Sequence, residues 1–207
     1  MIRIASSSTY FVPELEAGKA PERERMLLEI CSQEVSAFSE FISDLPMDTI
    51  LAASDKIRRS NRIFIFAHDI SKVPGEFLKL RLLILYYNVI LIDLSDLEQT
   101  QKTLRKLTEG DLVILFSFPR YYFPIGNIAK KASESGAPIL TITDSDASPA
   151  ACHSDLLLIC PTSTEMFYNS MTIPIAMLNI LASCLVIDSI SLSLIHISEP
   201  TRPLYIS

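Results

Sequence analysis

Two loops in this sequence carry hydroxyl and guanidinium groups directly after short apolar segments, and such groups bind small anions. The first loop ends at Ser71, and the second, SFPRYY, contains Ser117, Arg120 and Tyr121. A hydroxyl donates one hydrogen bond, whereas a guanidinium can bind a phosphate or a carboxylate through two N–H groups at once. We therefore expect a site for a small anion, with Ser71 and Ser117 as donors and Arg120 as the charged ligand.

A third polar loop follows the apolar segment 137–143 and extends this candidate site. In open α/β sheets, the groups that meet a ligand lie just beyond the carboxyl ends of the strands. Here those positions hold Thr143, Ser145 and Ser148. The complete set of candidate ligand-binding residues is Ser71, Ser117, Arg120, Tyr121, Thr143, Ser145 and Ser148.

Other titratable residues near these loops have more ordinary explanations than catalysis. His68 could shuttle a proton, but a single histidine at a strand end is more often a hydrogen-bonded structural residue. Glu165 could act as a general base, yet Thr162 precedes it by three residues, and T-x-x-E is also a helix start. Asp144 and Asp146 suit turns and helix caps better than a metal. We therefore expect no catalytic residue and no metal.

Composition excludes several other functions. The chain has only five glycines and none in the two anion loops, so a dinucleotide or Walker-type phosphate cradle is not expected, and no cofactor is predicted. A net charge of −6 argues against a nucleic-acid-binding surface on this chain. The four cysteines form no CxxC pair, which argues against a zinc site or a thiol redox motif.

The segments that must position these loops alternate between strand-like and helix-like patterns. This alternation predicts an α/β fold, a doubly wound five-stranded parallel sheet, because parallel neighbours need helical crossovers. In the flavodoxin-like strand order 2-1-3-4-5, the chain reverses between strands one and three, which brings the Ser71 and SFPRYY loops together. The predicted strands cover residues 62–67, 89–93, 112–116, 137–143 and 155–160.

Both ends of the chain differ in character from its middle. Residues 1–25 are expected to be a poorly ordered lead-in, and residues 26–47 an amphipathic helix that serves as a linker or in dimerisation. Residues 48–191 form the main domain. The stretch LSLIHISEPTRPLYIS, 192–207, resembles the translation of a sequencing-library adapter, so we expect a non-native tail.

The location of the protein is expected to be cytoplasmic. The N-terminal residues MIRIASSSTYF lack the apolar core of a secretory signal. The longest apolar run, 173–187, is interrupted by Asn179 and Ser183 and is short for a membrane crossing, so no membrane partner is expected.

The order of these loops resembles the sugar isomerase (SIS) domain of RpiR/MurR-type transcriptional regulators. The resemblance spans residues 51–187 and rests on SFPRYY, TDSDASP, DLLLICP and FYNSMTIPIAMLNILAS, each at its expected place. It implies a SIS fold that binds a phosphorylated sugar or a related anionic metabolite. Only Ser71 carries over from the family's first loop, and only Ser117 from its S-x-S-G-E-T loop.

The resemblance also implies partners and a role. RpiR-type regulators assemble as homodimers or tetramers and contact DNA through an N-terminal helix-turn-helix domain, which we expect to be absent from this chain. The leading interpretation is a sensing domain without enzymatic activity. Two alternatives remain: an aldose–ketose isomerase of sugar phosphates, and a degenerate SIS domain that serves only as an oligomerisation scaffold.

Overall fold

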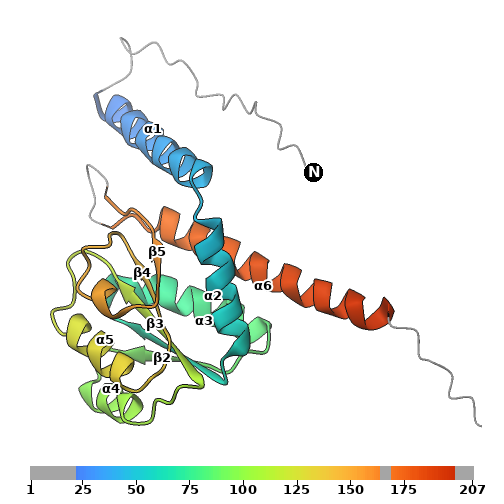
Figure 1. Cartoon of the computed structure of the whole chain (residues 1–207). Coiled ribbons are helices and arrows are strands. Elements are labelled where there is room, and N and C mark those ends of the chain that lie inside the picture. Colours follow the sequence, from blue (N-terminus) through green and yellow to red (C-terminus); the bar gives the residue numbers. More distant parts are fainter. Residues whose placement is uncertain (1–21, 164–168, 199–207) are drawn as a thin grey trace, which may run out of the picture.

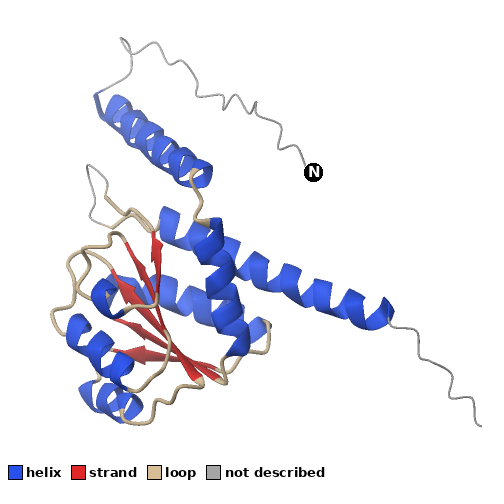
Figure 2. Ribbon diagram, viewed as in Figure 1, coloured by secondary structure: helices blue, strands red, loops and turns tan. Residues whose placement is uncertain are grey.

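A five-stranded parallel sheet forms the centre of the protein in a computed structural model that describes residues 22–163 and 169–198, with side chains up to residue 190 (Figure 2). The strand order is β2-β1-β3-β4-β5, and every neighbouring pair is parallel. This confirms the doubly wound fold and the flavodoxin-like order. The strands are β1 Arg62–Ala67, β2 Val89–Asp93, β3 Asp111–Ser117, β4 Ile139–Thr143 and β5 Leu156–Ile159.

The strands form because short apolar segments are covered on both faces. Every residue of β3 and β4 is buried, and so are five of the six residues of β1. Such strands show no polar alternation because neither face meets solvent. The predicted boundaries are confirmed for β1 and β2, whereas β3 is one residue longer at each end, and β4 and β5 are shorter than expected.

Helices cover both faces of the sheet, as the doubly wound prediction requires (Figure 1). On one face, an apolar cluster joins the sheet to the helices that contribute Ile50, Leu78 and Met177. On the other face, a second cluster contains Ile125 and Ala129. The helices of the first face are α2 Met47–Arg59, α3 Lys72–Ile84 and α6 Thr172–Ser198, and those of the second are α4 Leu97–Leu104 and α5 Ile125–Glu134.

An ion pair between the half-buried Arg62 and the buried Asp111 fixes the start of β3 against β1. Arg62 donates from Nε and Nη2 to the two carboxylate oxygens of Asp111, both at 2.7 Å, and Thr108 donates to Asp111 through its backbone N–H and its hydroxyl. Burial alone would raise the pKa of Asp111, but these hydrogen bonds outweigh that effect and hold its pKa below the usual value. Because its oxygens are all paired in this way, the Asp111 carboxylate can be buried at the N-terminal end of β3.

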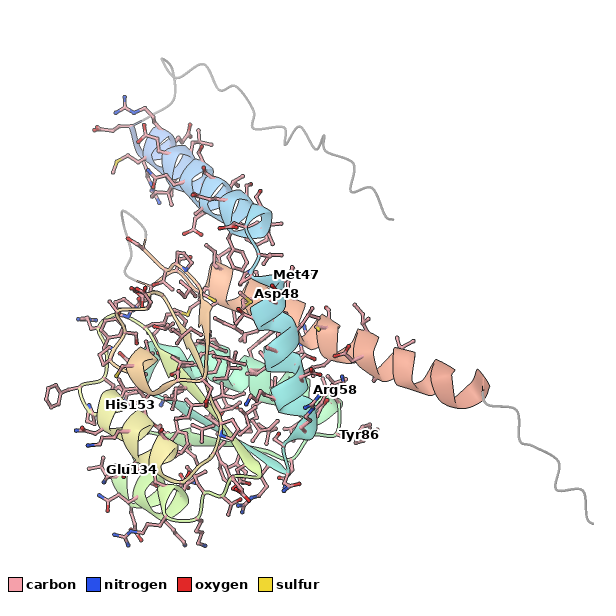
Figure 3. All side chains as sticks on the ribbon, in the orientation of Figure 1. Met47, Asp48, Arg58, Tyr86, Glu134 and His153 are labelled. Atoms are coloured by element: carbon pink, nitrogen blue, oxygen red, sulfur yellow. The ribbon has the colours of Figure 1, made fainter. Side chains whose placement is uncertain are left out.

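The first helix, α1 Glu22–Ser43, extends away from the sheet domain (Figure 1). Its side chains project around the helix clear of the other elements along most of its length (Figure 3), and Phe41 is its buried residue. The helix expected at 26–47 thus begins four residues earlier and ends at Ser43. Pro46 follows it, at the N-cap position of α2. Of the lead-in expected at 1–25, residues 1–21 lie outside the described part.

The last helix, α6, is a core helix that continues past the domain (Figure 1). Its segment Thr172–Ile190 has a mean hydropathy of 2.0 and is the one described helix long and apolar enough to cross a membrane. Core helices give the same signal, and here Met177, Leu178 and Leu181 are fully buried against the fold. Arg58 on α2, which is labelled in Figure 3, pairs with Asp188 on α6. The distance between Nη1 and Oδ2 is 3.5 Å.

Two expectations about helix ends are corrected or left open. Ser95 and Glu98 fit the S-x-x-E capping-box pattern, which predicts Ser95 as the N-cap of the helix that follows. The N-cap of α4 is instead Asp96, whose carboxylate accepts from the Gln99 N–H at 2.9 Å. The helix expected from about 165 begins at Thr172, and residues 164–168 lie outside the described part. Within the proposed adapter tail, residues 192–198 continue α6, and its non-native origin stays a prediction.

Candidate ligand-binding cleft

A cleft of about 230 Å³ lies at the point where the strand order reverses. The loop after β1, which contains the short helix η1 Asp69–Ser71, forms one wall, and the loop after β3 forms the other. Neighbouring strands of a parallel sheet end at the same edge, so the two loops meet there. The lining residues are His68, Asp69, Ile70, Ser71, Phe116, Ser117, Phe118, Pro119, Arg120, Tyr122, Ile125 and Asn169.

Ser71 offers an uncommitted hydroxyl to this cleft. The residue is 5% exposed, lines the cleft, and precedes α3. Its side chain does not cap α3, and it makes no hydrogen bond within the described part of the chain. Because a helix N-terminus carries partial positive charge, a hydroxyl at this position is well placed to donate to an anion.

Ser117 lies at the floor of the cleft and is held by two other predicted residues. The Oγ atoms of Ser117 and Ser148 are 2.8 Å apart, and both side chains are buried. Thr143 donates from Oγ1 to the backbone carbonyl of Ser117 at 2.6 Å. Ser148 and Thr143 therefore support the floor and do not line the cleft themselves. A hydroxyl bonded to one neighbour can still make a further hydrogen bond to a ligand.

Arg120 is the cation of the cleft. Its side chain is exposed, it lines the cleft, and it has no ion pair with any residue that the structure describes. The other nearby cation, Lys72, is bound to Asp93 with 2.8 Å between Nζ and Oδ2. A guanidinium without a carboxylate partner, in the same cleft as the uncommitted hydroxyl of Ser71, favours an anionic ligand.

The two tyrosines of the SFPRYY loop leave the cleft open. Tyr121 turns away and donates from its hydroxyl to Asp144 at 2.8 Å. Burial and this hydrogen bond together raise the pKa of Tyr121 to about 12. Tyr122 lines the cleft and stacks on His68, with ring centroids 4.2 Å apart, and its hydroxyl donates to the carbonyl of Leu94. Tyr121 is therefore not a lining residue, although the sequence proposed it as a ligand.

The structure thus divides the predicted site into three groups. Ser71, Ser117 and Arg120 line one cleft, as the predicted strand order requires. Ser148 and Thr143 lie beneath it. Ser145 and Tyr121 lie outside the cleft. Ser145 donates weakly to Asp146 at 3.4 Å, and Tyr121 donates to Asp144. Ligand binding by these seven residues stays a prediction, because their positions alone do not test it.

Asn169 lines the cleft, and the sequence did not indicate it. It lies in the segment between β5 and α6 and has φ 67°, in the left-handed region that asparagine tolerates better than most residues. Its side-chain amide donates to the carbonyl of Pro119 and accepts from Thr162 Oγ1 at 3.2 Å. The segment is far from the two loops in sequence, so only the fold brings it there.

The described residues contain no group of three or more His, Cys, Asp and Glu side chains that could hold a metal ion. Two groups capable of proton transfer, His68 and Asp69, do line the cleft. The hydroxyl of Ser95 lies 3.5 Å from His68 Nδ1. Glu165, the other possible base considered from the sequence, lies outside the described residues.

A small polar cleft at the reversal point of a doubly wound parallel sheet defines an α/β domain of the ligand-binding type. A family model for the SIS domain matches residues 56–184. The chain therefore belongs to the SIS-domain family, as its loops suggested. Among curated protein sequences, none matches this chain.

Solved structures with the same fold include both regulators and isomerases. The sugar isomerase domain of an RpiR transcription factor from Sphaerobacter thermophilus is 22% identical, with a TM-score of 0.74, over 84% of this chain and 97% of that domain. The Vibrio vulnificus NanR protein complexed with ManNAc-6P is 14% identical, with a TM-score of 0.66, over 88% of this chain and 78% of its own.

A third similar structure is a hypothetical protein from Methanococcus jannaschii, for which the function of a 3-hexulose-6-phosphate isomerase was inferred. It is 18% identical, with a TM-score of 0.63, over 79% of this chain and 91% of its own. Identities at this level show a common fold and leave the function of each site to its own residues.

Proposed function

We propose that this chain is a sensing domain that binds a phosphorylated sugar, or a related anionic metabolite, for an RpiR-type transcriptional regulator. The observation that carries this proposal is that Arg120 and Ser71, both without side-chain partners among the described residues, line the same cleft. Ser117 adds a third polar group at its floor. Such a set binds an anion through charge-assisted hydrogen bonds.

The fold neighbours support this class of ligand. One of them, NanR, is a complex with ManNAc-6P, a sugar phosphate. In this chain Pro119 removes one backbone donor from the loop that faces the ligand. Side chains must therefore do more of the binding, which makes Arg120 the principal ligand of the anionic group.

A second function, isomerisation of a sugar phosphate, has one observation in its favour. His68 and Asp69 line the cleft, and proton transfer between adjacent carbons needs such groups. His68, however, is stacked on Tyr122, and Asp69 is exposed to solvent. We favour binding without turnover.

Calorimetry with a panel of hexose phosphates and amino-sugar phosphates tests the proposal. We expect binding by the wild type and at least a tenfold weaker affinity for Arg120→Gln, because a charge-assisted hydrogen bond contributes about 1.5–3 kcal/mol. Arg105→Gln, which removes the same charge at the end of α4, is the matched control and should bind like the wild type.

Product analysis by NMR in the same samples separates the two functions. Binding without product supports the sensor, and product formation identifies an isomerase. If no sugar phosphate binds, or if Arg120→Gln and Arg105→Gln bind equally well, the anion site is not where we place it.

A further inference from the structure

The cleft and α1 are joined by a short chain of hydrogen bonds through the segment between β5 and α6. Asn169 donates to the carbonyl of Pro119, which directly precedes Arg120 in the cleft wall. The next residue, Ser170, donates from its hydroxyl to Glu34 Oε2 on α1 at 3.1 Å. Two adjacent residues therefore contact the cleft loop on one side and α1 on the other.

The segment that carries these two residues is anchored at its base. Thr162, which is 3% exposed, donates from Oγ1 to Asn169 Oδ1 at 3.2 Å, and its carbonyl accepts from the Ser170 N–H at 2.9 Å. Asn169 and Ser170 are thus both held by Thr162. Because they share an anchor, a shift of one displaces the other.

The attachment of α1 on this side is sparse, which makes a single hydrogen bond important. A cavity of about 420 Å³ separates α1 from the segment, and Glu34, Thr162 and Ser170 line it. Among the described residues, Glu34 to Ser170 is the one side-chain hydrogen bond between α1 and the sheet domain. The apolar contacts of α1 with the domain, at Phe38 and Phe41, lie one and two turns further along the helix.

We propose that Asn169 positions the cleft loop that carries Arg120, and that Asn169 and Ser170 couple occupancy of the cleft to the attachment of α1. The inference rests on the proposed function only in assuming that an anion binds beside Arg120. A ligand that fixes this loop also fixes the Pro119 carbonyl, and with it Asn169, Ser170 and Glu34. Binding should therefore suppress opening of α1 at its contact with the domain.

Hydrogen–deuterium exchange of α1 in the unliganded chain tests the link without any ligand. Asn169→Gly keeps the left-handed backbone and removes the side chain, and it touches no residue of α1. We expect faster exchange around Glu34 in Asn169→Gly, similar to that in Ser170→Ala. Ser163→Ala, on the same segment, is the control and should leave α1 unchanged. Exchange in α4 should not change in any of the three variants, which distinguishes a link to α1 from general destabilisation.

Inorganic phosphate serves as the probe for the second arm, with its binding followed by calorimetry. We expect phosphate to slow exchange around Glu34 in the wild type, and to bind Ser170→Ala without slowing α1. Asn169→Gly should bind phosphate about fivefold more weakly, as expected when one neutral hydrogen bond that holds the ligand loop is lost.

The results that overturn the inference differ from those that overturn the proposed function. If Asn169→Gly leaves exchange of α1 unchanged, or if α1 responds to phosphate equally in Ser170→Ala and the wild type, the coupling is wrong even though the cleft binds anions. If neither phosphate nor any sugar phosphate binds, the proposed function fails, while the exchange of α1 in unliganded Asn169→Gly still decides whether the link exists.

Discussion

Lys72 and Asp93 illustrate why a basic residue near the cleft is not by itself an anion ligand. Lys72 begins α3 beside the cleft, but its ammonium is bound to the carboxylate of Asp93, at the end of β2. Asp93 also accepts from the Ser95 backbone N–H at 2.9 Å. The carboxylate of Asp93 offsets the positive charge that Lys72 would otherwise present to an anion. Arg120 has no such competitor in the described part of the chain, so the two cations differ in role.

The Lys72 to Asp93 pair predicts a pH dependence of stability. The hydrogen bond from Lys72, followed by that from Ser95, lowers the pKa of Asp93 to about 2. A lowered carboxyl pKa contributes stability that is present above the unfolded value of about 4 and is lost as the pH falls toward 2. Urea unfolding should therefore show Asp93→Asn less stable than the wild type at pH 6, with the difference shrinking toward zero at pH 2.

The comparison needs a control, because removing any carboxylate changes the net charge. Asp146→Asn removes an exposed carboxylate from the loop after β4. A gap between Asp93→Asn and the wild type that is independent of pH, or that Asp146→Asn reproduces, would show that the pair with Lys72 is not its cause.

At the scale of elements, the start of α4 shows a difference between a local sequence pattern and the observed N-cap. Ser95 and Glu98 match the capping-box pattern, but Asp96 occupies the N-cap position with extended backbone and accepts from the Gln99 N–H. The Asp93 carboxylate meanwhile accepts from the N–H of Ser95. Ser95 therefore belongs to the turn after β2, and α4 begins one residue later than the pattern suggests.

The N-cap assignment predicts unequal effects of two neighbouring substitutions. Asp96→Ala should lower the free energy of unfolding by about 1 kcal/mol, because an N-cap side chain satisfies an otherwise unpaired N–H of the first turn. Ser95→Ala should cost less, because its exposed hydroxyl does not cap α4 and lies at the long distance of 3.5 Å from His68 Nδ1. Chemical denaturation of both variants measures the two free energies of unfolding. A larger loss of stability in Ser95→Ala than in Asp96→Ala would show that Ser95 is the N-cap, as the capping-box pattern predicts.

At the scale of the whole molecule, α1 leaves a heptad-spaced apolar stripe uncovered. Leu28, Val35 and Ile42 are each separated by seven residues and are 38%, 44% and 40% exposed. Cys31, which is also exposed, falls between Leu28 and Val35 at the spacing of a coiled-coil seam. The contacts of α1 with the domain, through Glu34, Phe38 and Phe41, lie beside this stripe on the helix. We propose that the stripe packs on α1 of a second copy, which agrees with the dimerisation helix expected from the sequence.

Sedimentation velocity checks this proposal. Val35→Glu places a charge in the centre of the stripe and should shift the chain toward the monomer, since a buried unpaired charge is costly. Ser36→Glu, one residue away on the exposed surface of the same helix, should leave the oligomeric state unchanged. Equal behaviour of the two variants would place the contact between copies elsewhere, and a monomeric wild type would exclude it.

The sequence by itself determined the strands, their order along the chain and the three lining residues Ser71, Ser117 and Arg120. Buried parallel strands appear as short apolar runs, and ligand groups follow their carboxyl ends, so both signals are local. Local signals were less reliable at element ends, as Ser95 shows, because several polar residues in one turn compete for the same N–H groups.

Only the tertiary structure decided which polar residues reach the cleft. It turned Tyr121 to Asp144 and placed Ser148 beneath Ser117. It also brought Asn169 across from a distant segment to Pro119. These contacts join residues 23, 31 and 50 positions apart in sequence, and their geometry depends on how the sheet and its loops pack together. The spacing of residues along the chain does not encode that packing, so only the folded arrangement of the loops determines which partner each side chain meets.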